Sequence, residues 1–228
     1  MKMLPFLFLL ISINMIAQSD FEKAEKLFDQ KKWEQAKPLF EIHLKISPSD
    51  LKTIEYLGDI AGHLQNWDNC IYYYNKLKTL KPSEANYWYK YGGGLGMKAS
   101  LKKNMESLRM VYKAQEAFEK AIELNKKHID ARHALVTLYL RLPGIFGGSE
   151  RKAQKYSDEL MSLSKVDGYL SQGYIDEYFD RNKKAEISYI KAHEIGNSKT
   201  TFQKLYNLYL NKLKDKTKAT KLKEQFEK

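Results

Sequence analysis

Four pairs of residues in the first part of the chain recur at a spacing of 34 residues. The pairs are Trp33 and Trp67, Ala36 and Cys70, Phe40 and Tyr74, and Pro48 and Pro82. A fixed period of this length indicates a repeat architecture, in which each unit buries its apolar face only by stacking on its neighbours. The small residues suit a close helix crossing, and each proline ends a helix that it cannot continue. The period therefore predicts a chain of stacked helical units.

The period continues to the end of the chain with two irregularities. The third unit carries ten additional residues near Leu101–Met110, and because this segment contains no Pro or Gly we expect it to lengthen both helices of the unit. The fourth unit is interrupted by the sequence LPGIFGGS. The lysine-rich end is expected to form a solubilising cap. The predicted units are residues 17–50, 51–84, 85–128, 129–165 and 166–199, followed by the cap at 200–228.

With this spacing of small, aromatic and proline residues, the chain resembles the tetratricopeptide-repeat (TPR) superfamily. The resemblance implies an all-α fold, a right-handed solenoid of about five antiparallel hairpins plus a C-terminal helical pair, in a single domain over residues 18–228. A Gly-rich helix, the lengthened third hairpin and a P-G-x-x-G-G loop at Pro143–Gly148 are together similar to a family of exported bacterial TPR proteins. The resemblance implies no particular reaction, so it indicates an architecture and leaves the partner open.

The first 17 residues have the pattern of a secretory signal peptide. Lys2 precedes an apolar run from Leu4 to Ile16, and the small residue Ala17 marks the expected cleavage site. The run is too short to span a bilayer comfortably. The sequence therefore predicts an exported protein, periplasmic or secreted, and an uncleaved N-terminal membrane anchor is the alternative.

The net charge of +11 is compatible with nucleic acid, with an anionic surface or with simple solubility. Because the lysines are spread over the chain without a compact basic block interleaved with aromatic residues, no nucleic-acid partner is expected. Contact with an anionic envelope surface through the basic end, Lys212–Lys228, is an alternative function. The single cysteine, Cys70, excludes an intrachain disulfide, and at a small-residue position it is predicted to be a buried, inert thiol.

The sequence predicts no catalytic residue, metal site or cofactor. The five histidines lack a metal-ligand spacing, and no nucleophile stands out beside a base. The glycine run at 92–96 follows no strand and lacks the Gly-Lys-Ser/Thr of a phosphate-binding loop, since Gly96 is followed by Met97.

Glycines inside a helix lower its stability, which indicates close packing, and we expect the run at 92–96 to pack against the loop Pro143–Gly148. That loop is expected to bury Ile145 and Phe146, with an exposed docking tip as the alternative. An enzyme or small-ligand site at this junction of the third and fourth units is a second alternative function.

In TPR proteins the first helices of successive hairpins line a concave groove that commonly holds an extended peptide or a helix. The repeat frame places seven candidate partner-binding residues there, which are Tyr89, Met97, His133, Leu140, Arg141, Tyr174 and Tyr178. An acidic end of the groove is expected from Glu25, Asp29, Glu55 and Asp59. Because these acids would repel an anionic ligand, we expect a basic or amphipathic protein or peptide as the partner. The alternative is that the aromatic residues only pack between helices. The expected function is a non-catalytic, protein-binding scaffold or adaptor of the cell envelope.

Overall fold

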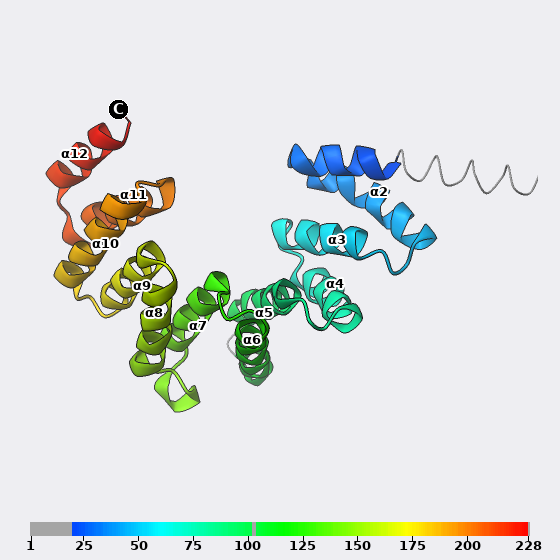
Figure 1. Cartoon of the computed structure of the whole chain (residues 1–228), viewed down its shortest axis with the longest axis horizontal. Helices are drawn as coiled ribbons and strands as arrows, with labels where there is room; N and C mark the ends of the chain where they lie inside the picture. The colour runs from blue at the N-terminus through cyan, green and yellow to red at the C-terminus, as the bar shows by residue number, and fades with distance from the viewer. Residues whose placement is uncertain (1–19, 102–103, 228) are drawn as a thin grey trace, which may run out of the picture. The chain divides into compact units, whose positions relative to one another are not determined.

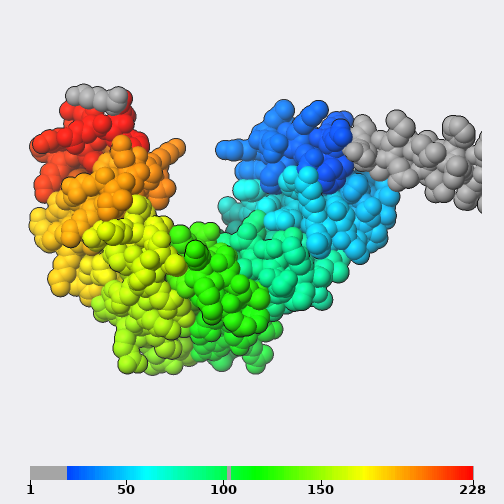
Figure 2. All heavy atoms as spheres, in the orientation of Figure 1, coloured from blue at the N-terminus to red at the C-terminus, as the bar shows by residue number. Residues whose placement is uncertain are grey.

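The computed structural model describes residues 20–101 and 104–227, and within these ranges all regular structure is helical (Figure 1). The predicted signal peptide lies outside the described residues. The chain divides into two compact units, which meet in sequence between Leu124 and Asn125, and each is described by itself. We call them unit 1 and unit 2. In the space-filling view the colours within each unit follow the chain order, so successive helices lie side by side (Figure 2). The single continuous domain stays a prediction.

Unit 1 consists of three helical hairpins. Helical residues 20–29 pair with α2, and the next two hairpins follow without a break. The turn inside a hairpin is tight and places one residue in the left-handed region, Lys31 at φ 60° and Gln65 at φ 57°. The helices of unit 1 after residues 20–29 are α2 (Trp33–Ile46), α3 (Leu51–His63), α4 (Trp67–Leu80), α5 (Ala85–Ser100) and α6 (Met105–Leu124).

Unit 2 continues the same pattern and ends in a less regular pair of helices. Its two hairpins are α7 with α8 and α9 with α10. The last pair is completed by the ring of Phe226, which stacks on Phe202 with centroids 4.4 Å apart. The elements are α7 (Ile129–Arg141), the 3-10 turn η1 (Gly144–Phe146), α8 (Glu150–Leu163), α9 (Lys165–Tyr178), α10 (Asn182–Gly196), α11 (Lys199–Asn207), the π-helix η2 (Leu208–Leu213) and α12 (Lys216–Phe226).

In the hairpins α3–α4 and α9–α10, one large side chain of the second helix fills the space above a glycine of the first. A Cβ added to Gly58 would lie 2.8 Å from the ring of Tyr74, and one added to Gly173 would lie 2.5 Å from the ring of Tyr189. Both tyrosine rings are fully buried. Close packing at this crossing explains why the repeat alternates small and aromatic residues.

The lengthened third hairpin is confirmed. Helix α5 has 16 residues where α3 has 13, and α6 has 20 residues where α4 has 14. Both helices are longer than their counterparts, but Leu101 and Asn104 are not helical, so of the predicted segment only residues 105–110 lie in a described helix, α6.

Two predictions about the irregular region are wrong. Gly92 and Gly94 do pack closely, but against helices of their own unit: a Cβ at Gly92 would lie 2.8 Å from the Phe118 ring on α6, and one at Gly94 would lie 3.3 Å from the Cys70 sulfur on α4. A Cβ added to Gly93 or Gly96 would meet no atom within 4 Å, so the close packing of this run lies within unit 1.

The loop between α7 and α8 is not buried. The Ile145 side chain is 87% exposed and that of Phe146 is 37% exposed. The helix lengths of α7 and α8 already complete a full hairpin, so the loop extends beyond the packed region rather than filling a gap in it.

Candidate partner-binding faces

Helix α5 presents a flat face on unit 1. This α5 face consists of Tyr89, Gly93, Gly96 and Met97, which lie three or four residues apart and so share one side of the helix. Tyr89 is half-buried with its ring 6.0 Å from that of Phe118, and Met97 is 48% exposed. Between them the two glycines leave open space where side chains would stand. Two of the predicted partner-binding residues, Tyr89 and Met97, therefore lie together on a partly exposed surface.

The predicted acidic residues of unit 1 are largely neutralised from within. Glu25 accepts a hydrogen bond from the Tyr56 hydroxyl at 2.8 Å and forms an ion pair with Lys52 at 2.6 Å. Burial alone would raise the pKa of Glu25, but the hydrogen bonds from Lys52 and Tyr56 outweigh it and lower that pKa. Glu25 is thus held as a carboxylate whose charge is compensated by the following hairpin.

The same arrangement recurs one hairpin later. Lys90 Nζ donates to both carboxylate oxygens of Asp59 at 2.7 and 2.8 Å and lies 3.8 Å from Glu55. The hydroxyl of Tyr87 donates to Glu55 at 3.2 Å, and that of Tyr74 donates to Asp59. Glu25, Glu55 and Asp59 are therefore each bound by a Lys or Tyr of the next first helix, and we call this set of contacts the acid ladder.

Sequence reasoning missed the basic half of the ladder although a signal was present. Tyr56 follows Glu25 by 31 residues, Tyr87 follows Glu55 by 32 and Lys90 follows Asp59 by 31. Such a spacing, slightly shorter than the repeat, places the partner on the next first helix. Asp29, the fourth predicted acid, is exposed.

In unit 2 the predicted residues are spread over α7 and α9. His133 Nε2 lies 3.1 Å from the Asp167 carboxylate, and Tyr174 lies under the ammonium of Lys204, 5.2 Å from the ring centroid. Tyr178 is 43% exposed. A cation over an aromatic face contributes about 0.5–1 kcal/mol at an exposed site, so Lys204 holds Tyr174 in place.

Two further predicted residues sit at the end of α7 and differ in environment. Arg141 is exposed, but Leu140 is only 5% exposed. Leu140 therefore belongs to the core of unit 2, and its assignment to a binding surface is wrong. Leu140 lies four residues after Val136, which is also buried, so the two share the core-facing side of α7.

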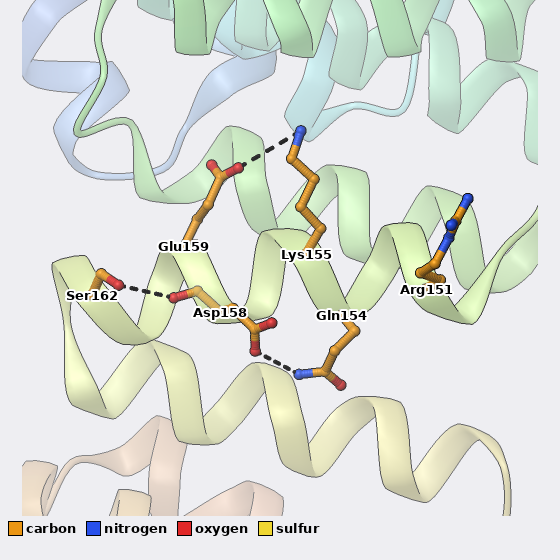
Figure 3. Close-up of a pocket in the computed structure, with 6 residues that line it drawn as sticks. All are labelled: Arg151, Gln154, Lys155, Asp158, Glu159 and Ser162. Atoms are coloured by element: carbon orange, nitrogen blue, oxygen red, sulfur yellow. Dashed lines mark hydrogen bonds and ion pairs between the residues drawn. The ribbon is translucent and has the colours of Figure 1, made fainter.

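A shallow hollow of about 530 Å³ lies along the outer side of α8 (Figure 3). Its side chains all come from α8, where Gln154 pairs with Asp158 at 2.8 Å and Lys155 with Glu159 at 3.9 Å. Two of them also bind neighbouring helices, since Gln154 donates to Gln172 on α9 and Glu159 pairs with Arg132 on α7. They run along the helix rather than converging on one point (Figure 3). The lining residues are Arg151, Gln154, Lys155, Asp158, Glu159 and Ser162.

Neither the thiol nor the acidic residues of the described ranges form a reactive or metal-binding centre. Cys70 is buried, and burial raises its pKa to about 11, as expected for an inert thiol. Across residues 20–101 and 104–227, no three His, Cys, Asp or Glu side chains are grouped as a metal site would require. In the same ranges no helix has the length and apolar composition needed to cross a membrane.

No family model matches the sequence, and no curated protein matches it either. The comparison with solved structures is decisive for the fold. A thermophilic TPR protein of Thermus thermophilus superposes with a TM-score of 0.68 at 15% identity, over 85% of this chain and 99% of that one. The chain has the TPR fold. PilW, described as a widely conserved type IV pilus biogenesis factor, has a TM-score of 0.66 at 14% identity over 92% of this chain and 91% of its own. The TPR protein YrrB has a TM-score of 0.54 at 16% identity over 80% of this chain and 87% of its own.

Proposed function

We propose that this TPR chain is a non-catalytic scaffold of the cell envelope that holds a segment of another protein against its first helices. The observation that carries the proposal is the α5 face. Glycine in a helix interior costs about 1 kcal/mol relative to alanine. Gly92 and Gly94 are required for close packing inside unit 1, whereas Gly93 and Gly96 have no neighbour there. Because these two positions leave the backbone of α5 uncovered, they favour a partner whose chain packs directly against the helix.

The solved structures of similar fold support a protein-binding role. YrrB is described as having an unusual peptide-binding site, and PilW as a pilus biogenesis factor. Helical hairpins stacked in this way leave their first helices available on one side, and a peptide or helix can lie across several of them.

The contacts of the acid ladder argue against a strongly basic partner. A strongly basic segment would have to compete with Lys52 and Lys90 for the carboxylates that these lysines already bind. The α5 face itself offers an aromatic ring, a thioether and bare backbone. We therefore propose an amphipathic segment whose apolar side lies on the α5 face, rather than a strongly basic one.

Export through the predicted signal peptide supports a location in the periplasm or outside the cell. Mass spectrometry of the mature N-terminus tests this: a start after Ala17 supports export with cleavage, and an intact first residue in a membrane fraction supports the anchored alternative.

The binding proposal is tested by blocking the α5 face. The variant Gly93→Leu/Gly96→Leu places bulk in open space, so it should fold normally and lose a partner captured from a cell-envelope extract by at least tenfold in affinity. The variant Tyr174→Ala/Tyr178→Ala tests the face of unit 2. Tyr72→Ala, an exposed tyrosine on the second helix α4, is the matched control. Unchanged affinity in both face variants would show that the partner binds elsewhere.

A further inference from the structure

The loop between α7 and α8 presents an apolar tip with no polar side chain. Residues 143–147 are all exposed and read Pro-Gly-Ile-Phe-Gly. Ile145, at 87% exposure, is the most exposed large apolar side chain of the described residues, ahead of Leu101 at 67%. An isolated exposed Leu or Ile needs no explanation, but a projecting run without any hydrogen-bonding side chain indicates contact with an apolar phase.

The backbone of the tip is rigid and largely satisfied from within. The amides of Phe146 and Gly148 donate to the Pro143 carbonyl at 2.9 and 3.1 Å, and that of Gly147 donates to the Gly144 carbonyl at 3.0 Å. Proline has no N–H to satisfy. Gly147 has φ 96°, and a Cβ at Gly148 would lie 1.7 Å from a carbonyl oxygen, so both positions require glycine. A turn that bonds its own amides can leave water at a low cost.

Basic side chains surround the base of the tip. Arg141 precedes the loop and Arg151 follows it, both exposed, and neither forms an ion pair among the described residues of unit 2. The one acid nearby, Glu150, is bound by Arg181 at 2.6 Å. Residues 125–198 contain 12 Lys and Arg against 10 Asp and Glu, and residues 199–228 contain 9 Lys against 3 Asp and Glu. The positive charge beside the loop therefore comes from Arg141 and Arg151, and most of the remaining excess belongs to the C-terminal pair.

We propose that this loop is a membrane-contact element that inserts Ile145, at its tip, into the interfacial region of an anionic lipid bilayer, with Arg141 and Arg151 bound to lipid phosphates. The inserted side chain buries apolar surface, and each arginine near the surface adds electrostatic attraction. A bilayer is favoured over a pocket on a protein because the tip offers no directional hydrogen bond from any side chain. This contact is additional to partner binding on the first helices and does not depend on it.

The loop and the basic C-terminal helix are separate surfaces of unit 2. In Figure 1 the loop projects from the end of the unit remote from α12. Lys212 and Lys218 at the C-terminal pair are also bound to Asp180 and Glu186, at 2.8 and 2.6 Å. The loop can therefore be tested without changing α12.

The experiment uses the mature chain and vesicles of phosphatidylglycerol mixed with phosphatidylcholine, compared with phosphatidylcholine alone. Ile145→Cys carries an environment-sensitive fluorophore, and Cys70 should not react because it is buried with its pKa raised to about 11. We expect a blue shift of the fluorophore with anionic vesicles only. In co-sedimentation without label, Ile145→Ser should lower the partition coefficient about tenfold, and Arg141→Gln/Arg151→Gln roughly 25-fold.

Matched variants separate this loop from other routes. Ile187→Ser removes an isoleucine of the same unit that is 57% exposed on α10, and should change the partition coefficient less than twofold. Lys216→Gln/Lys221→Gln tests α12, and circular dichroism verifies that each variant is folded. The proposal is overturned if anionic vesicles bind neither the chain nor the fluorophore, if Ile145→Ser binds as well as wild type, or if only the α12 variant loses binding. A fluorophore that responds to an added protein and not to vesicles would replace the bilayer by a protein pocket.

Discussion

Two adjacent glycines of α5 should respond to the same substitution with opposite signs. At Gly93 an added methyl group meets no atom within 4 Å, so Gly93→Ala adds only the higher helix propensity of alanine. That gain is about 0.8–1.0 kcal/mol, partly because the unfolded chain loses conformational freedom. For a chain of this length it raises the Tm by about 2–4 °C.

At Gly92 the same methyl group lies 2.8 Å from a Phe118 ring carbon and 3.1 Å from the Ala114 carbonyl oxygen. The ring can shift slightly but the carbonyl is part of α6, so overpacking of about 1–3 kcal/mol outweighs the propensity gain and the net effect is a loss. Urea unfolding followed by circular dichroism measures both variants. If Gly93→Ala destabilised the chain as much as Gly92→Ala, the α5 face would not be open and the proposed binding face would fail with it.

Three further outcomes follow from the contacts described above. Burial, with the hydrogen bond to Glu25, raises the pKa of Tyr56 from 10.0 to about 12. Between these pH values the unfolded chain releases a proton that the folded chain keeps, so the free energy of unfolding should fall as the pH rises from about 10 to about 12. Urea midpoints across that range measure this fall, which should be less steep in Tyr56→Phe. Lys90→Met leaves Asp59 without its cation and should lower the free energy of unfolding by about 1 kcal/mol at neutral pH. Lys90→Arg should keep most of that stability, and no loss in Lys90→Met would show that the pair is fully solvated. Gly148→Ala should lower stability by about 2–3 kcal/mol in urea unfolding, and a urea midpoint equal to that of wild type would show that the loop does not hold this turn.

The positions of the hairpins were predictable because they depend on local sequence. Proline spacing and small-residue periodicity determine where a helix ends and where two helices cross, and these signals survive even where the repeat is degenerate. The greater length of the third hairpin was predictable because residues 101–110 contain no Pro or Gly, but the break between α5 and α6 at Leu101 and Asn104 was not.

The surroundings of individual residues were less predictable because they depend on which element lies opposite. The sequence shows four similar glycines in α5, and only the packing distinguishes them. A Cβ added to Gly92 would contact the Phe118 ring, whereas one added to Gly93 would contact no atom within 4 Å. Hydrophobicity alone suggested that Ile145 is buried, although the two helices on either side of its loop already complete their own core. Leu140 was wrongly assigned to the binding surface, because a shift of one position on a helix turns a side chain by about a quarter of a turn, enough to move it from the surface into the core.

The acid ladder has a consequence for how such a chain can be rearranged. A carboxylate on one hairpin and its Lys or Tyr on the next form a matched joint, as Glu25 does with Lys52 and Asp59 does with Lys90. A generic repeat can be deleted, duplicated or exchanged with little penalty, but here each such event would leave half of a joint facing the wrong neighbour. The hairpins of unit 1 therefore have a fixed order. Shortening or lengthening the array would require each carboxylate and its Lys or Tyr partner to be transferred together to neighbouring hairpins.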